Sequence, residues 1–269
     1  MEPTQRRMGR PKKFQGKDTQ PTILAVDRAL DVLDALAHAN GMTLSQLATR
    51  LDQSPATMHR VLATLHAREI VEIDQQTQAW HIGSAAFRMG SAFLRRSSIV
   101  ERSRPVMREL MEATGETSNL GIERNGEVMF ISQVETNESI RAFFPPGTLS
   151  PMHASGIGKA LLSCYSDHRT SQYFRSAELT GFTDKTITQP LALKDELIGI
   201  REKGWAFDDE EKAEGMRCIA APIKDIYGEA IAGISISGPT QRIPESAVDR
   251  IGTLVADAAA RVSRGLGSS

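Results

Sequence analysis

The chain has 269 residues, of which 40% are apolar and 24% are charged, and its formal net charge is −1. This composition is typical of a globular protein with enough apolar residues for a core, and it excludes a wholly disordered chain. No apolar run approaches the roughly 18 to 20 residues of a transmembrane helix, and the basic N-terminus lacks the apolar stretch of a secretory signal.

The chain contains two cysteines, Cys164 and Cys218, and neither lies in a CxxC pair or beside a cluster of histidines. This spacing argues against a disulfide framework and against a structural zinc site. We therefore expect a protein without a metal or a membrane partner, located in the reducing cytoplasm.

Basic residues are concentrated at the N-terminus. Residues 1–20 carry a formal charge of +4, so the remaining residues carry −5. Glycine and proline are frequent there and apolar residues are rare, which predicts a disordered basic arm over residues 1–21. Arg10 lies between Gly9 and Pro11, a context that suits insertion into a narrow DNA minor groove. A solubilising terminus without a partner is the alternative.

Residues 22–83 predict three helices followed by a β-hairpin. The first helix begins with Thr22 as its N-cap and ends at Asn40-Gly41, and its apolar stripe is expected to face the core. That stripe consists of Val26, Ala29, Leu30, Leu33, Leu36 and Ala37. The second helix begins with a capping box formed by Thr43 and Gln46. Two β-prone runs follow at residues 70–73 and 79–82.

The third helix, residues 54–68, has Ser54 as its predicted N-cap and Pro55 at its first helical position. Thr57 and Arg60 point away from its apolar side, where a recognition helix would contact the major groove of DNA. Three helices and a hairpin wing describe a winged helix-turn-helix DNA-binding domain. A packing module that binds protein, or binds nothing, is the alternative interpretation.

Residues 84–98 predict a linker helix, and residues 99–266 predict a second domain. Its elements begin with a helix, residues 99–111, and a hairpin around Asn125-Gly126. Further helices are expected at about 155–165, 167–176, 190–203 and 244–264, and further strands at 205–208, 218–224 and 230–237. This order predicts an α+β domain with a mainly antiparallel sheet.

Two segments of the second domain suggest chemistry. Residues 155–158 open a helix, where free backbone N–H groups attract a carboxylate, although the spacing to Lys159 does not fit a phosphate-binding loop. Residues 208–211 are four consecutive acids, but alternate side chains of an extended segment point in opposite directions, which argues against a metal site. No G-x-S-x-G elbow is present, so we assign no catalytic residues and predict that the protein is not an enzyme.

The chain resembles the IclR-type bacterial transcriptional regulators over residues 22–265. Five segments carry the resemblance: Gly9-Arg10-Pro11, the helix from Ser54 with His59 and Arg60, residues 149–162, residues 207–221, and residues 234–238. The resemblance implies a winged helix domain that binds double-stranded operator DNA, with His59 on its recognition helix. It also implies a linker helix that forms a homodimer, and a GAF-like effector-binding domain that pairs dimers into tetramers.

Within the family, the chain is most similar to the glyoxylate-responsive regulators. This resemblance implies an effector site in which backbone N–H groups and polar side chains hold a small 2-oxo acid and smaller residues shape the walls. The implied residues are Gly156, Ile157, Asp208, Cys218, Ser235, Ser237, Ala142, Ser150 and Met216. No cofactor is implied. Glyoxylate is the expected effector, and pyruvate and a larger organic acid are the alternative effectors. The alternative function is that of an enzyme acting on small carboxylates.

Overall fold

The computed structural model describes residues 23–96 and 98–268. The chain divides into two compact units, with the division between Phe93 and Leu94. The predicted α+β class is confirmed, since a helical unit with a small sheet precedes a unit built on a large antiparallel sheet. Among the described residues, no helix has the length and apolar content needed to cross a membrane.

The first unit contains three helices and a three-stranded sheet. Its elements are α1 (Leu24–Ala37), β1 (Met42–Thr43), α2 (Leu44–Arg50), α3 (Pro55–His66), β2 (Val71–Ile73) and β3 (Ala79–Ile82). Strands β1 and β2 flank β3, and both pairings are antiparallel. The predicted hairpin at 70–82 is therefore present, and β1 is an additional strand that the sequence pattern did not indicate.

Local side-chain hydrogen bonds start α2 and α3 as predicted. At α2, the backbone N–H of Gln46 donates to the Thr43 hydroxyl, and the backbone N–H of Thr43 donates to Gln46 Oε1 at 2.8 Å. At α3, the Ser54 hydroxyl accepts from the backbone N–H of Thr57 at 3.1 Å, and Pro55 is the first helical residue. Both caps are confirmed, although α3 ends at His66 rather than near Arg68.

The prediction for α1 was wrong in two respects. The N-cap is Ile23, which makes no capping side-chain hydrogen bond, and Thr22 lies outside the described residues; the helix also ends at Ala37, before Asn40-Gly41. Its buried residues are Val32, Ala35 and Leu36, whereas Val26 and Leu30 are 51% and 54% exposed. A helix with apolar residues on more than one side does not show by periodicity alone which side meets the core.

Helix α4 (Ser84–Arg96) contains the division between the units, and α5 (Ser98–Thr114) is the first helix that lies wholly in the second unit. The strands of the second unit are β4 (Thr117–Arg124), β5 (Glu127–Val134), β6 (Leu149–Pro151), β7 (Ala206–Asp209), β8 (Met216–Lys224) and β9 (Ala230–Pro239). They form one antiparallel sheet in the order β6-β5-β4-β9-β8-β7. Asn125 and Gly126 both have positive φ angles, 54° and 84°, as the predicted tight hairpin turn requires.

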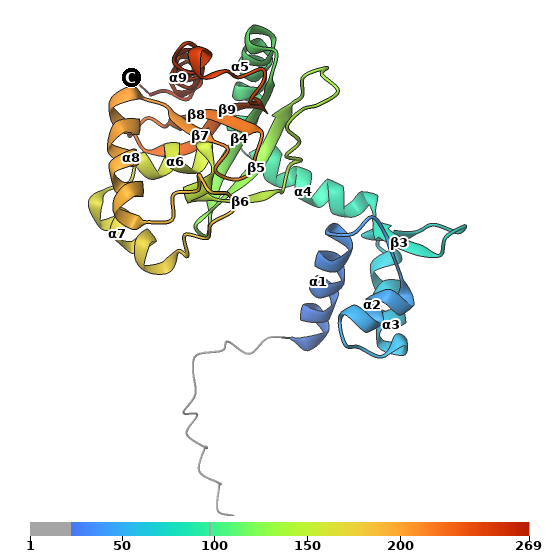
Figure 1. Cartoon of the computed structure of the whole chain (residues 1–269). Helices are drawn as coiled ribbons and strands as arrows, with labels where there is room; N and C mark the ends of the chain where they lie inside the picture. The colour runs from blue at the N-terminus through green and yellow to red at the C-terminus, as the bar shows by residue number, and fades with distance from the viewer. Residues whose placement is uncertain (1–22, 97, 269) are drawn as a thin grey trace, which may run out of the picture. The chain divides into compact units, whose positions relative to one another are not determined.

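Helices cover both faces of this sheet (Figure 1). One face carries α6 (Gly156–Ser163), with α7 (Asp167–Ser176) and α8 (Pro190–Lys203) in the same apolar cluster, and the other carries α5 and α9 (Val248–Gly265). Ile157 of α6 packs onto two glycines, because a Cβ at Gly233 would lie 2.7 Å from the Ile157 side chain and one at Gly121 would lie 3.3 Å from it. These glycines let the start of α6 approach the sheet closely.

Candidate functional site

Polar side chains gather where α6 begins, against the middle of the sheet. Asp208 of β7 is the direct partner of Cys218 on β8, and Cys218 is the direct partner of Ser237 on β9. Directly paired residues lie on the same face of an antiparallel sheet. A Cβ at Gly156 would lie 2.9 Å from the Cys218 sulfur, so the first residue of α6 lies against this thiol. Five of the sequence-predicted effector residues, including Ser235 two positions before Ser237, therefore share one face.

The two serines of β9 differ in their hydrogen bonding. Ser237 Oγ accepts a hydrogen bond from Asn119 Nδ2 at 3.2 Å, and Asn119 Oδ1 accepts from Gln133 Nε2 at 2.9 Å. Ser235 is fully buried, and its hydroxyl has no hydrogen-bond partner among the described residues. A buried hydroxyl without a partner costs free energy, which a ligand atom at this position would recover.

Asp208 is the titrating group of the site. Burial, and secondly the negative charge of Glu211, raise the pKa of its carboxyl group to about 7. Lys159 and the backbone N–H groups of Glu211 and Lys212 lower this pKa, and the Glu211 N–H donates to Asp208 Oδ1 at 2.9 Å. A carboxyl group with this pKa titrates near neutral pH, and its protonated form can donate a hydrogen bond.

The Cys218 thiol is protonated at physiological pH. Burial raises its pKa to about 11, with a further contribution from the charge of Asp208, while the nearby Ser237 and Ser235 hydroxyls and the Gly156 N–H lower it. A thiolate is the nucleophilic form of cysteine, so this site lacks the activated sulfur of a catalytic cysteine. The residue as a whole is half-buried, and its protonated thiol is a weak hydrogen-bond donor toward a ligand.

The start of α6 supplies backbone donors. Ser155 is its N-cap, and the Ser155 hydroxyl accepts from the Gly158 N–H at 3.4 Å. The first N–H groups of a helix have no carbonyl partner within the helix, and the helix dipole favours a negative charge at this end. Gly156 and Ile157 occupy these positions, as the sequence predicted for a carboxylate-binding turn.

Lys159, which in the sequence stands out only through a spacing that does not fit a phosphate-binding loop, is a buried cation in the structure. Its side chain is fully buried, and its Nζ donates to Glu211 Oε1 at 2.5 Å, to the Phe207 carbonyl at 2.5 Å and to Glu196 Oε1 at 3.0 Å. Burial lowers the Lys159 pKa, but the two glutamates raise it more, so the amine stays charged. This cation joins α6 to β7 and α8 directly beside Asp208.

The acidic run 208–211 does not form a metal site. Asp208 is buried, whereas Asp209 pairs with Lys185 at 3.0 Å and with Arg217 at 2.6 Å. Glu210 pairs with Lys185 at 2.7 Å. In the part of the chain that the structure describes, no group of three or more acidic, histidine or cysteine side chains is arranged to hold a metal.

The remaining effector candidates are more widely spread. Met216 lies two residues before Cys218 on the same strand, so both are on one face. Ala142 is buried in the connection between β5 and β6, and Ser150 is buried on β6. Strands β5 and β4 separate β6 from β9, so Ser150 lies at the opposite side of the sheet from Asp208. The structure therefore brings Met216 next to the site but does not join Ser150 to it.

The candidate DNA-binding residues of the first unit lie on and before α3. Ser54, His59 and Arg60 are exposed, and Thr57 is half-buried. The Ser54 and Thr57 hydroxyls contact each other at 2.9 Å. Arg10 lies outside the described residues. The exposed side of α3 thus presents the polar residues that the sequence placed there.

Comparison with known proteins identifies both units. Residues 25–75 match the IclR helix-turn-helix domain, and residues 91–264 match the bacterial transcriptional regulator IclR C-terminal family. The HTH-type transcriptional regulator BhcR of Paracoccus denitrificans is 53% identical over 264 residues, covering 97% of this chain and 95% of that protein. The transcriptional repressor IclR of Escherichia coli K12 is 36% identical over 248 residues, covering 91% and 90%.

The crystal structure of the Thermotoga maritima IclR aligns with a TM-score of 0.79 at 28% identity, covering 91% of this chain and 99% of that one. These relatives are transcriptional regulators and not enzymes, in agreement with the prediction from sequence. The chain therefore belongs to the IclR family of bacterial transcriptional regulators, which bind DNA through a helix-turn-helix domain and respond to small-molecule effectors.

Proposed function

We propose that this regulator responds to a small 2-oxo acid, with glyoxylate as the first candidate. In this proposal, residues 99–266 bind the effector, residues 22–83 bind operator DNA, and residues 84–98 link the two. The observation that carries the proposal is the buried Ser235 hydroxyl, which makes no hydrogen bond of normal geometry within the described residues and lies on the face shared by Cys218 and Ser237.

The chemistry of the site fits a small carboxylate with an adjacent carbonyl group. The N–H groups of Gly156 and Ile157 and the hydroxyl of Ser235 are donors for the carboxylate. Asp208 and the Cys218 thiol are placed to meet the aldehyde or its hydrate. Such a ligand is small enough to be enclosed by a few convergent polar groups.

The walls of the site determine which acid fits. Met216 lies beside Cys218 on β8, while Ala142 and Ser150 are buried residues of the β5–β6 region. We propose Met216 as a wall residue; Ser150, which lies on the opposite edge strand of the sheet from Asp208, is not part of this proposal. Pyruvate and larger organic acids are the alternative effectors.

For DNA recognition, we propose that α3 enters the major groove, with Ser54 and Thr57 near its N-terminus and His59 and Arg60 on its exposed side. Arg10 of the basic arm would insert into the adjacent minor groove. An arginine inserted into a narrow minor groove adds affinity because the negative potential is enhanced there.

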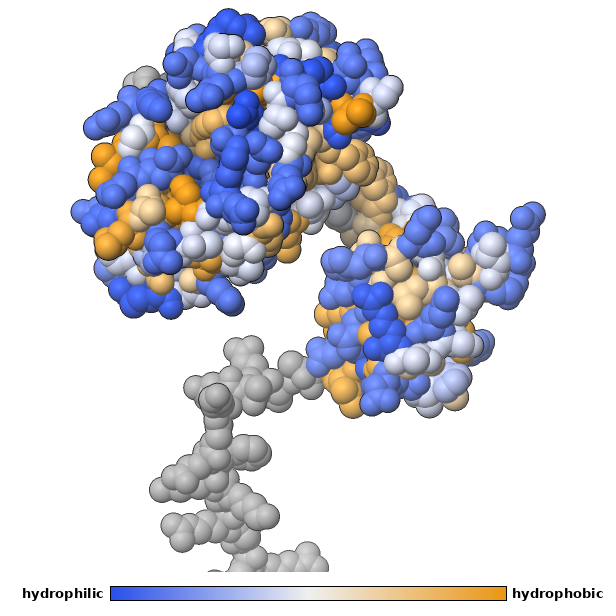
Figure 2. All heavy atoms as spheres, in the orientation of Figure 1, coloured by the Kyte–Doolittle hydropathy of each residue, from blue (hydrophilic) through white to orange (hydrophobic). Residues whose placement is uncertain are grey.

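We further propose a homodimer formed through the first unit and α4, with dimers pairing into tetramers. On α1, Ile23, Val26 and Leu30 recur at helical spacing on one side and are between 51% and 70% exposed. On α4, Phe87 and Met89 are 75% and 62% exposed. Apolar atoms are visible on the surface of both units (Figure 2). Exposed apolar residues in such groups favour association with a second copy.

A gel-shift titration tests the proposed function. The full chain is mixed with the DNA upstream of its own gene, with glyoxylate, pyruvate or oxalate, and with acetate as the control that lacks a 2-oxo group. We expect retardation of the DNA and a change in affinity with glyoxylate that acetate does not produce. If the DNA is retarded but no 2-oxo acid alters the affinity, the effector assignment is wrong while the DNA-binding assignment stands.

A further inference from the structure

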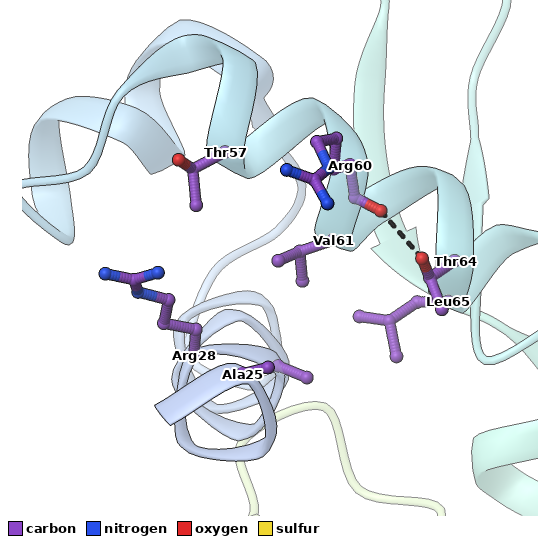
Figure 3. Close-up of a pocket in the computed structure, with 8 residues that line it drawn as sticks. Ala25, Arg28, Thr57, Arg60, Val61, Thr64 and Leu65 are labelled. Atoms are coloured by element: carbon purple, nitrogen blue, oxygen red, sulfur yellow. Dashed lines mark hydrogen bonds between the residues drawn. The ribbon is translucent and has the colours of Figure 1, made fainter. Parts of the chain in front are cut away.

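A cavity of about 300 Å³ lies between α1 and α3 in the first unit (Figure 3). Arg28 projects into it from α1, and Arg60 borders it from α3. Small and aliphatic residues form the rest of its wall together with two threonines. The complete lining is Ala25, Arg28, Ala29, Thr57, Arg60, Val61, Thr64 and Leu65.

The two arginines have no counter-ion within the described part of the chain. Among the described residues, neither Arg28 nor Arg60 makes an ion pair, although carboxylates are frequent on α1. The Nε of Arg28 is buried and has no hydrogen-bond partner in the described part of the chain. A guanidinium group stays charged at all physiological pH values, and a buried donor without an acceptor is costly. Two cations at one cavity are therefore arranged for an anion from outside the domain.

The hydroxyl groups of the cavity are already engaged. Thr64 Oγ1 donates to the Arg60 carbonyl at 2.8 Å, drawn as a dashed line in Figure 3, and Thr57 Oγ1 contacts Ser54 Oγ at 2.9 Å. The free donors are therefore the guanidinium groups, whose planar N–H pattern matches the oxygens of a phosphate.

We propose that this cavity receives a backbone phosphate of bound DNA, with Arg28 as its main cationic contact and Arg60 at its rim. The proposal rests on the placement of α3 in the major groove and extends the DNA-binding surface to α1. In helix-turn-helix motifs the recognition helix contacts the bases while the other helix of the motif, here α2, crosses the sugar-phosphate backbone, so a phosphate held between α1 and α3 would be a contact beyond the motif itself. Arg28 then contributes charge neutralisation and orientation, and not sequence recognition.

Salt dependence distinguishes a phosphate contact from a base contact. Arg28→Ala and Arg28→Lys are compared with the parent chain on the upstream DNA and on an unrelated duplex of equal length. For Arg28→Ala, we expect the negative slope of log affinity against log salt to become shallower by about 0.9 for each bound copy. The affinity should decrease by the same factor on both DNAs. Arg28→Lys keeps the charge and should keep the slope. Lys194→Ala, which removes an exposed cation of the second unit, is the control and should change neither value.

An unchanged slope for Arg28→Ala on both DNAs would overturn the proposal, as would a loss confined to the upstream DNA, because that pattern indicates base recognition. If α3 does not occupy the major groove, the parent chain itself fails to prefer the upstream DNA over the unrelated duplex. Failure of the Arg28–phosphate contact instead leaves this preference intact and gives Arg28→Ala the same salt slope as the parent chain.

Neutral phosphate substitution tests the contact without altering the parent protein. Single methylphosphonate linkages are placed in turn along each half of the binding site. We expect one position per half-site at which the neutral linkage weakens binding of the parent chain but leaves binding of Arg28→Ala unchanged. If every position weakens both proteins by equal factors, Arg28 does not contact a phosphate.

Discussion

Asp208 and Cys218 face each other across the antiparallel strands β7 and β8, so an acid with a pKa of about 7 lies beside a thiol with a pKa of about 11. Burial is the main cause of both upward shifts. Near neutral pH the thiol is uncharged and Asp208 is the group that changes charge. The site thus offers uncharged donors when Asp208 is protonated and an additional negative charge when it is not.

Effector binding is therefore expected to depend on pH. An anionic acid is repelled by ionised Asp208 and accepts a hydrogen bond from the protonated form, so affinity should rise as pH falls from about 8 to about 6. At pH values above the pKa of Asp208, the effector affinity should decrease by up to about tenfold per pH unit if binding takes up one proton. Calorimetry with glyoxylate across this range, in buffers of different ionisation enthalpy, measures both the affinity and the proton uptake.

Asp208→Asn should remove this pH dependence, because an amide has no titrating proton. Asp209→Asn is the matched control: Asp209 follows Asp208 but pairs with Lys185 and Arg217, and contacts with these cations lower its pKa despite the opposing effect of burial. If Asp209→Asn abolishes the pH dependence and Asp208→Asn does not, the titrating group has been misassigned.

Replacing Lys159 should strongly destabilise the second unit. Lys159→Met leaves Glu211 buried without its cation, and removing one partner of a buried ion pair typically costs about 3–5 kcal/mol. Lys185→Ala, which removes a cation that is 48% exposed, should cost at most about 1 kcal/mol. Urea unfolding followed by circular dichroism measures both, and equal effects would show that burial of Lys159 has no energetic importance.

Arg60→Ala should weaken binding to the upstream DNA by about 1–3 kcal/mol, the usual contribution of a good major-groove contact. The exposed position of Arg60 on α3 makes a large change in folding improbable, which a melting curve can check. A folded variant with unchanged affinity would remove α3 from the DNA interface.

Deleting residues 1–20 should lower DNA affinity and flatten its salt dependence. The deleted segment carries a charge of +4, and fewer bound cations displace fewer counterions from the DNA. Affinities of the full and shortened chains measured over a range of salt concentrations test this. Identical slopes would show that the basic arm makes no contact with DNA.

Local signals in the sequence were enough to predict many elements of the fold. Side chains that bond to neighbouring backbone groups, as at Thr43 and Ser54, and the positive-φ turn at Asn125 involve residues close in sequence. The short strands β1 and β6 could not be predicted in this way, because each pairs with a segment distant in sequence, Met42 with Trp80 and Leu149 with Met129, whereas the equally short β2 pairs within a local hairpin. The buried face of α1 also depends on what packs against it.

The candidate effector site was predicted mainly by resemblance, and the structure adds residues that local patterns do not reveal. Asn119 bonds to Ser237 across 118 positions of sequence, and Lys159 bonds to Glu211 across 52. The sequence signal for Lys159 is its position within an apolar helix segment. A lysine buried in such a segment requires acidic partners, so its position could have predicted an internal ion pair. The resemblance also grouped Ser150 with residues from which the sheet separates it.

Titration calorimetry of glyoxylate, pyruvate and oxalate against the parent chain and the Ser235→Ala/Ser237→Ala double variant tests the central claim most directly. Each polar contact to a small buried anion contributes roughly 1–3 kcal/mol, so the double variant should lose at least about tenfold in affinity. Its DNA binding without effector should be preserved, since these serines lie in the second unit. Glyoxylate binding as tight as that of the parent would contradict this site, and failure of the parent to bind any of the acids would contradict the effector class.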